Sequence, residues 1–234
     1  MEGLLLRKNN LQNFLINMKI FLSVGHNSRN GGASYFGTNE YREVSAIVKE
    51  VSKSNLPSVV YVPHGSIKSK VEWLNLNMKK DDIMIELHMD AGKWNSEGAM
   101  CYYNRNDKHA KIAAEKILKQ YCKSGMDYRY VKEESKSRYG KLGMIRDLKN
   151  PSNAFILELG FISSSWDLSF MKHHSANGIV RMLKYLSLKT NVKVLRSKIY
   201  VLKQALNSVK NAKYYSAFNR ALTSIYKKMK KLIG

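Results

Sequence analysis

A length of 234 residues accommodates one sizeable α/β domain with an appendage and excludes two full domains. An apolar fraction of 44% with only 3 prolines excludes a disordered chain, and 2 cysteines exclude a disulfide-rich scaffold. The net charge of +22 indicates a polyanionic partner, which could be nucleic acid, acidic lipid or a phosphate-rich wall polymer.

The first 17 residues predict neither a secretion signal nor a membrane span. Their short apolar patch is interrupted by Arg7 and Lys8, and no small-residue cleavage site follows it. Nowhere does the chain contain the run of about 18 apolar residues that a membrane-spanning helix needs. We therefore interpret residues 1–17 as an extension before a domain that begins near Met18.

Short β-branched or apolar runs predict strands, and apolar residues at helical spacing predict helices between them. The predicted strands are residues 19–24, 59–62, 83–87, 99–103 and 155–159, and the predicted helices are residues 41–54, 69–78, 109–122 and 168–188. This alternation predicts an α/β fold, a mainly parallel twisted sheet with helices on both faces.

The composition changes near residue 190. Asp167 is the last acidic residue, so residues 168–234 contain no carboxylate side chain. Apolar spacing predicts two basic amphipathic helices at 193–210 and 213–232, arranged as a C-terminal hairpin. The chain is thus predicted to consist of the extension 1–17, an α/β domain at 18–188 and a basic helical tail at 189–234. The tail could bind anionic wall polymer or lipid, or its charges could simply be solvated.

Two histidines and a glutamate stand where a metal site could form. His26 follows the first predicted strand, His88 follows the third, and Glu40 opens the first helix. The carboxyl ends of parallel strands meet at one edge of a sheet, and a hydrolytic zinc needs three His, Asp or Glu ligands. Each residue alone is more often structural, but together they favour zinc. Glu43, on the same helical face, is an alternative to Glu40.

Glu158 lies inside the apolar segment FILELGF. Burying a carboxylate in such a strand is costly unless the group is paired, bound to metal or functional. The functional interpretation is a general base whose pKa is raised by desolvation. The structural alternative is an ion pair with an arginine such as Arg146.

The segments SVGHN, NEYREVSAIVKEV, ELHMDAG and LGMIRDLKNPSNAFILELGFIS resemble, in this order, the zinc-dependent N-acetylmuramoyl-L-alanine amidases of the amidase-3 type. This family includes autolysins, spore-lytic enzymes and phage endolysins. The resemblance covers about residues 18–188, and its most specific part is the Glu-Leu-Gly-Phe segment. It implies that His26, Glu40 and His88 bind one Zn²⁺ and that Glu158 is the catalytic carboxylate.

The sequence departs from the family pattern beside two of these residues. Asn27 stands where the family often has glycine, and Asp90 stands where asparagine is frequent. Together with Trp94, in the loop after His88, these residues are predicted to contact substrate.

The resemblance implies a peptidoglycan hydrolase that cleaves the amide bond between N-acetylmuramic acid and L-alanine of the stem peptide. We expect a phage or prophage endolysin, made in the host cytoplasm without a signal peptide and acting at the cell wall. A bacterial autolysin or spore-lytic amidase is the alternative. A non-catalytic wall-binding protein would lack one of the four site residues, and a nucleic-acid-binding protein would show a recognition motif that this chain lacks.

Overall fold

The computed structural model describes residues 18–93, 96–208, 216, 220, 223 and 224. The predicted extension 1–17, Trp94 and most of the predicted second tail helix lie outside these described residues. Met18–Lys184 forms one compact unit, and the described residues from Tyr185 onward belong to a second. Among the described helices, none has the length and apolar character needed to cross a membrane.

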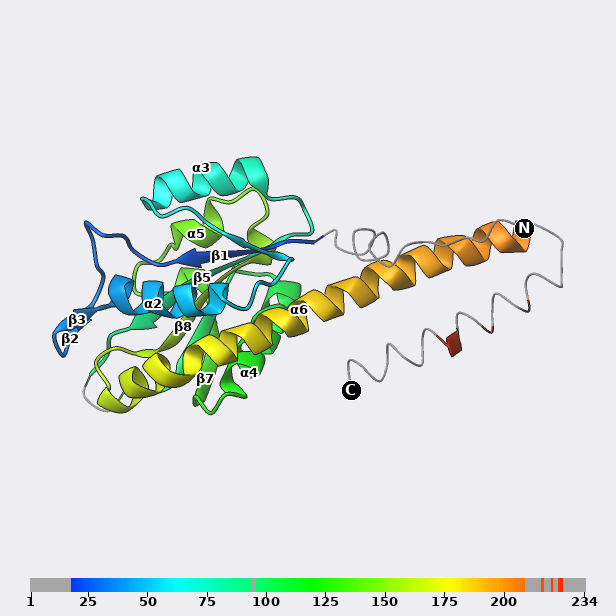
Figure 1. The fold of residues 1–234 in the computed structure, drawn as a ribbon. Helices are drawn as coiled ribbons and strands as arrows, with labels where there is room; N and C mark the ends of the chain where they lie inside the picture. Colours follow the sequence, from blue (N-terminus) through cyan, green and yellow to red (C-terminus); the bar gives the residue numbers. More distant parts are fainter. Residues whose placement is uncertain (1–17, 94–95, 209–215, 217–219, 221–222, 225–234) are drawn as a thin grey trace. The chain divides into compact units, whose positions relative to one another are not determined.

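A six-stranded sheet in the order β4-β1-β5-β8-β6-β7 forms the centre of the Met18–Lys184 unit (Figure 1). Its strands are β1 (Ile20–Val24), β4 (Val59–Tyr61), β5 (Ile83–Asp90), β6 (Ala99–Tyr103), β7 (Tyr128–Glu133) and β8 (Ala154–Phe161). Neighbouring strands from β4 to β8 are parallel, β6 is antiparallel to β8, and β7 is parallel to β6. The predicted mainly parallel sheet is confirmed.

Helices cover both faces of this sheet (Figure 1). The helices of this unit are α2 (Glu40–Ser52), α3 (Ile67–Asn77), α4 (Lys108–Cys122), the single turn α5 (Gly143–Arg146) and the part of α6 (Ser165–Ser208) up to Lys184, with 3₁₀ turns η1 (Glu134–Lys136) and η2 (Pro151–Asn153). The helices α3 and α5 pack together on one face. On the other face, α2 contacts β1 and β5, and α4 contacts β6, β7 and β8.

Side-chain alternation along the strands assigns residues to the two faces. Phe21, Met84 and Ile156 lie in one buried cluster with Leu74 of α3 and Met144 of α5. Burial of these apolar side chains stabilises the fold by roughly 25 cal/mol for each Å² of surface removed from water. This stabilisation holds α3 and α5 on this face of the sheet.

The same face carries polar residues toward the carboxyl ends of its central strands. In the parallel register of β5 and β8, His88 lies opposite Glu158, and Glu86 lies opposite Ile156. Ser23 of β1 lies opposite Glu86 on its other side. The sheet therefore brings His88 and Glu158 side by side, although 70 residues of chain separate them in sequence.

The sequence misplaced the ends of one strand and one helix, and it did not predict the strand β7. The strand predicted to end at residue 87 continues to Asp90, because β8 pairs with it through His88 and Asp90. His88 therefore lies within a strand and not beyond its end, whereas Glu158 lies within a strand as predicted. The strand β7 was not predicted, because it is an edge strand with few apolar residues, as edge strands often are.

The helix predicted to end near residue 188 is instead continuous as α6 from Ser165 to Ser208. The composition becomes basic near residue 190, but residues 188–193 contain neither glycine nor proline, so nothing in the backbone ends the helix there.

Candidate metal centre and active site

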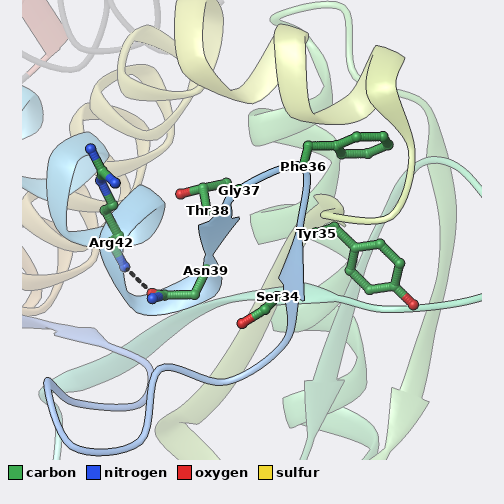
Figure 2. Close-up of a pocket in the computed structure, with 7 residues that line it drawn as sticks. All are labelled: Ser34, Tyr35, Phe36, Gly37, Thr38, Asn39 and Arg42. Atoms are coloured by element: carbon green, nitrogen blue, oxygen red, sulfur yellow. Dashed lines mark hydrogen bonds between the residues drawn. The ribbon is translucent and has the colours of Figure 1, made fainter.

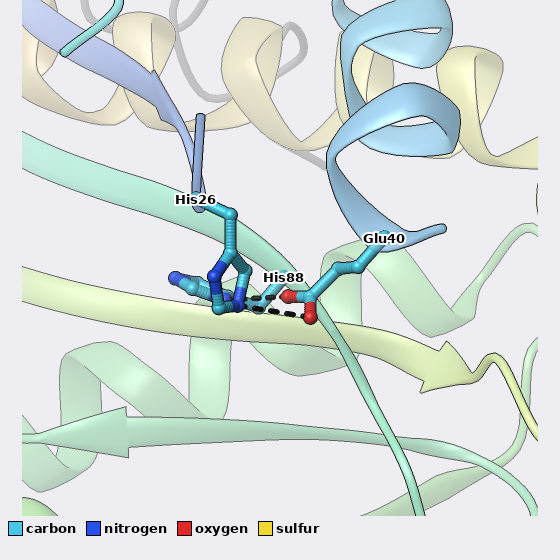
Figure 3. A group of neighbouring side chains, drawn as sticks. All are labelled: His26, Glu40 and His88. Carbon is cyan, nitrogen blue, oxygen red and sulfur yellow. Dashed lines mark hydrogen bonds and ion pairs between the residues drawn. The ribbon is translucent and has the colours of Figure 1, made fainter. Parts of the chain in front are cut away.

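His26, Glu40 and His88 converge at the carboxyl edge of the sheet (Figure 3). Their three ligand atoms all lie within 4.8 Å of one another. One carboxylate oxygen of Glu40 lies 3.0 Å from His26 Nε2, and the other lies 2.6 Å from His88 Nδ1. Two imidazole nitrogens and a carboxylate form the donor set that zinc takes in hydrolases.

The Glu40 carboxylate is fixed by its place in the chain. Asn39 caps α2 by accepting a hydrogen bond from the Arg42 backbone N–H, so Glu40 is the first helical residue. Its oxygens also accept hydrogen bonds from the backbone N–H groups of Met89, at 3.1 Å, and Ala33, at 3.3 Å. These contacts hold the carboxylate between the two imidazole rings.

The loop after β1 brings its backbone against the three side chains at two glycines. A Cβ atom on Gly25 would overlap the His88 ring, and one on Gly32 would lie 2.6 Å from His26 Cδ2 and overlap the Glu40 carboxylate. Gly32 has φ of +72° and His26 has φ of +59°, a region that costs a non-glycine residue energy. The loop conformation is therefore set by the site that it encloses.

The ionisable groups of this cluster shift one another's pKa values. Burial alone would raise the pKa of Glu40, but hydrogen bonds from His26 and His88 outweigh it and lower that pKa to about 2. Burial would lower the pKa of His88, but Glu40 and Glu86 raise it well above its usual value. The Glu40 carboxylate is thus held as an anion between two imidazole rings.

Glu158 lies in a different environment on the neighbouring strand. Its Oε2 atom is buried and has no hydrogen-bond partner among the described residues. Burial raises the pKa of Glu158 to about 8, against a smaller opposing effect of His88. A carboxyl group with this pKa can accept and donate a proton near neutral pH.

The geometry separates the alternatives that the sequence left open. Glu43 accepts a hydrogen bond from Thr38 Oγ1 at 2.6 Å and lies 3.4 Å from Lys172 Nζ, so the cluster includes Glu40 and not Glu43. Arg146 pairs with the buried Glu134 and does not pair with Glu158. The alternative of an Arg146–Glu158 ion pair is therefore wrong.

A pocket of about 330 Å³ joins the cluster of His26, Glu40 and His88 to Glu158. Asn27 and Asp90, which were predicted to contact substrate, both line it. Asp90 accepts a hydrogen bond from the Ala91 backbone N–H, and burial raises its pKa. Trp94 lies outside the described residues, so its predicted contact stays a prediction. The exposed Arg138 also lines the pocket.

A second, more open pocket lies on the hairpin of β2 (Ser34–Tyr35) and β3 (Thr38–Asn39), directly before α2 (Figure 2). Tyr35 and Phe36 are exposed at its edge, and their ring centroids are 6.3 Å apart. Its lining residues include no histidine, cysteine or carboxylate, so this pocket offers no side-chain ligand for a metal ion.

Three further residues of this region, Glu86, Lys70 and Gly32, were not predicted from the sequence. Glu86 could have been found, because residues two apart on a strand share a face and His88 was already a candidate. Lys70 and Gly32 carry no such signal, since their positions depend on how α3 and the first loop fold over the sheet edge.

Residues 20–185 match the model of a family described as N-acetylmuramoyl-L-alanine amidase. No curated protein sequence gives a significant match. The family match covers the whole sheet and every residue of the cluster.

Solved structures of amidases share this fold. An N-acetylmuramoyl-L-alanine amidase from Clostridium difficile 630 has 18% identity and a TM-score of 0.60, over 72% of this chain and 96% of that one. The catalytic domain of CwlV from Bacillus (Paenibacillus) polymyxa has 21% identity and a TM-score of 0.58, over 72% and 98%. The catalytic domain of the CD27L endolysin, which targets Clostridia difficile, has 20% identity and a TM-score of 0.57, over 74% and 97%.

Proposed function

The chain belongs to the N-acetylmuramoyl-L-alanine amidase family, and we propose that it works as a zinc enzyme with Glu158 as its proton carrier. As a member of this family it is a peptidoglycan hydrolase that cleaves the amide bond between N-acetylmuramic acid and L-alanine. The proposal adds the metal, its ligands His26, Glu40 and His88, and the part that each takes in the reaction.

The observation that carries the proposal is the convergence of the three ligand atoms within 4.8 Å of one another, beside the buried Oε2 atom of Glu158, which has no partner among the described residues. Nitrogen and carboxylate donors in this number leave one zinc position open. The orphaned Oε2 atom of Glu158 also fits, because a buried acceptor without a partner is costly unless a ligand satisfies it.

When bound, zinc supplies Lewis acidity that lowers the pKa of a water molecule from about 16 to about 7 and polarises the amide carbonyl. Glu158 accepts the proton of the attacking water and donates it to the nitrogen of the departing L-alanine amine. The pKa of about 8 suits both transfers. Asn27 and Asp90 line the pocket and are proposed to orient the substrate.

The test compares the wild-type protein with Glu158→Ala on purified cell walls. Zinc content is measured for both proteins, together with turbidity loss and release of new N-terminal alanine. We expect bound zinc in both proteins and new alanine amine from the wild type alone. A zinc-loaded wild type that releases no alanine amine would refute the assigned bond, and a wild type without zinc would refute the metal site.

We further propose that the enzyme is a phage or prophage endolysin. The family includes such enzymes as well as autolysins and spore-lytic amidases, which are the alternative. Expression in the cytoplasm of a susceptible host separates them. An endolysin should lyse the cells only after the membrane is permeabilised, whereas an exported autolysin would act without permeabilisation.

The basic C-terminal residues support a proposed contact with anionic wall polymer or lipid, since residues 168–234 contain no carboxylate side chain. Such attraction is screened by salt. Binding to walls should therefore weaken between about 50 and 500 mM salt, and removal of the anionic polymers from the walls should abolish this salt dependence. A specific nucleic-acid partner is not part of the proposal.

A further inference from the structure

A buried charged cluster beneath His88 takes no part in the chemistry proposed above. It consists of Glu86 on β5, Lys70 on α3 and Ser23 on β1, which are only 3%, 3% and 0% exposed. A lysine and a glutamate this deeply buried are rare, and their desolvation is costly. The cluster is therefore expected to serve the site above it.

Glu86 is the centre of this cluster. Its Oε1 atom accepts hydrogen bonds from Lys70 Nζ at 3.0 Å and from Ser23 Oγ at 3.2 Å. Its Oε2 atom lies 3.1 Å from His88 Nε2. The carboxylate thus uses one oxygen to anchor itself and the other to contact a ring of the metal-binding cluster.

The two ring nitrogens of His88 have separate partners. Nδ1 faces the Glu40 carboxylate and the metal-binding cluster, whereas Nε2 faces Glu86. An imidazole that binds a metal through Nδ1 carries its proton on Nε2 and can donate it to one acceptor. In this structure Glu86 is that acceptor.

Lys70 connects the cluster to the other histidine. Its ammonium group donates to the carbonyl oxygen of Val24, and it lies 3.5 Å from that of His26. One buried cation therefore neutralises Glu86 and holds the end of β1, from which the His26 loop departs.

We infer that Glu86 is a positioning residue that holds His88 with Nδ1 toward the metal, and that Lys70 fixes both Glu86 and the backbone at His26. This inference rests on the proposed zinc site. On this inference, removal of the Lys70–Glu86 pair lowers the affinity for the metal. Removal of a purely structural pair would lower only the stability of the fold. Loss of a hydrogen bond to the outer nitrogen of a metal-binding histidine lowers metal affinity by about 10- to 100-fold.

The test needs variants that remain folded, because losing one partner of a buried ion pair is destabilising. The double variant Lys70→Met/Glu86→Met replaces both charges by apolar side chains of similar length and removes the acceptor of His88. We expect it to stay folded and to bind zinc about 10- to 100-fold more weakly than the wild type. Zinc affinity is measured by competition with a chromophoric chelator.

A second double variant, Lys70→Met/Glu86→Gln, is the conservative rescue. The glutamine amide oxygen can accept the Nε2 proton of His88 without a lysine beside it. We expect it to recover much of the zinc affinity, and the absorption spectrum of its Co²⁺ form should resemble that of the wild type, unlike that of the Met/Met variant.

Asp82→Asn is the matched control. Asp82 is 1% exposed at the opposite end of β5, where it accepts hydrogen bonds from the backbone N–H groups of Lys19 and Lys79. This substitution should lower the melting temperature and leave zinc affinity unchanged.

The outcomes separate the inference from the proposed function. Wild-type zinc affinity and an unchanged Co²⁺ spectrum in the Met/Met variant would overturn the inference alone. If zinc affinity falls equally in the Met/Met and Met/Gln variants, the hydrogen bond from His88 to residue 86 is not the cause of the loss. A wild-type protein that binds no zinc would overturn both proposals.

Discussion

The carboxyl groups on the two sides of the pocket differ in the hydrogen-bond donors around them. On the β5 side, Glu86 and Glu40 each contact a ring nitrogen of His88 and further hydrogen-bond donors. On the β8 side, the Oε2 atom of Glu158 has no partner among the described residues. The pKa values follow this difference, since donors lower those of Glu40 and Glu86 and burial raises that of Glu158.

This contrast indicates that the carboxyl groups of the pocket have two different roles. A carboxylate with many donors stays ionised and fixed, as a metal ligand or its support must be. A carboxyl group without donors can change its protonation state near neutral pH, as a proton carrier must.

The largest effect is expected from Glu40→Gln, which removes the anion between the two histidines. Zinc affinity should fall by more than about 100-fold, beyond the usual effect of an indirect contact, and activity should fall with it. Glu43→Gln is the control on the same helix and should leave zinc affinity unchanged. Equal losses in the two variants, measured by metal titration, would contradict the assignment of Glu40.

Gly32→Ala tests whether the site depends on the close approach of the first loop. Its Cβ would enter the space of Glu40 and His26, so zinc affinity should fall by about 10- to 100-fold. Gly37→Ala is the matched control, because Gly37 has a similar φ of +74° and open space around it. Both variants should lose about 1–2 kcal/mol of stability to the backbone conformation, but only Gly32→Ala should lose metal.

Glu158→Gln should change how the stability of the metal-free protein depends on pH. The pKa of Glu158 is about 8 in the folded state and about 4.3 in an unfolded chain. Folding therefore favours the protonated form, and the stability that this contributes is complete below pH 4 and lost as the pH rises through 8.

The variant lacks this titration, so its stability relative to the wild type should increase between pH 5 and 9 by a few kcal/mol, at about 1.4 kcal/mol per pKa unit. The free energy of unfolding is measured in urea with a chelator present. Glu50→Gln, at an exposed position, is the control. A constant difference between Glu158→Gln and wild type would contradict the raised pKa.

Arg138→Gln is expected to have the smallest effect. Arg138 lines the pocket with Glu158, and its charge opposes the effect of burial on the Glu158 pKa. Its removal should move the acid limb of kcat/KM to higher pH by less than about one unit, because Arg138 is exposed and screened by solvent and salt. Arg105→Gln, outside the pocket, should leave the pH profile unchanged.

The sequence by itself determined the class of the fold and the family. Strand and helix periodicities of the α/β domain predict its mainly parallel sheet, because burial of apolar side chains dictates those periodicities. His26, Glu40, His88 and Glu158 stand in motifs specific enough to be assigned to the family. The local sequence around each residue was sufficient for these inferences.

Tertiary structure alone decided how these residues meet. The register of β5 against β8 places His88 opposite Glu158, and no local pattern specifies this register. Glu43 lies beside Lys172 of α6, and Arg146 pairs with Glu134, which excludes both from the site. Lys70 contacts Glu86 because α3 packs over the sheet at that point. These contacts join different helices, strands and turns, so they depend on the packing of the whole domain.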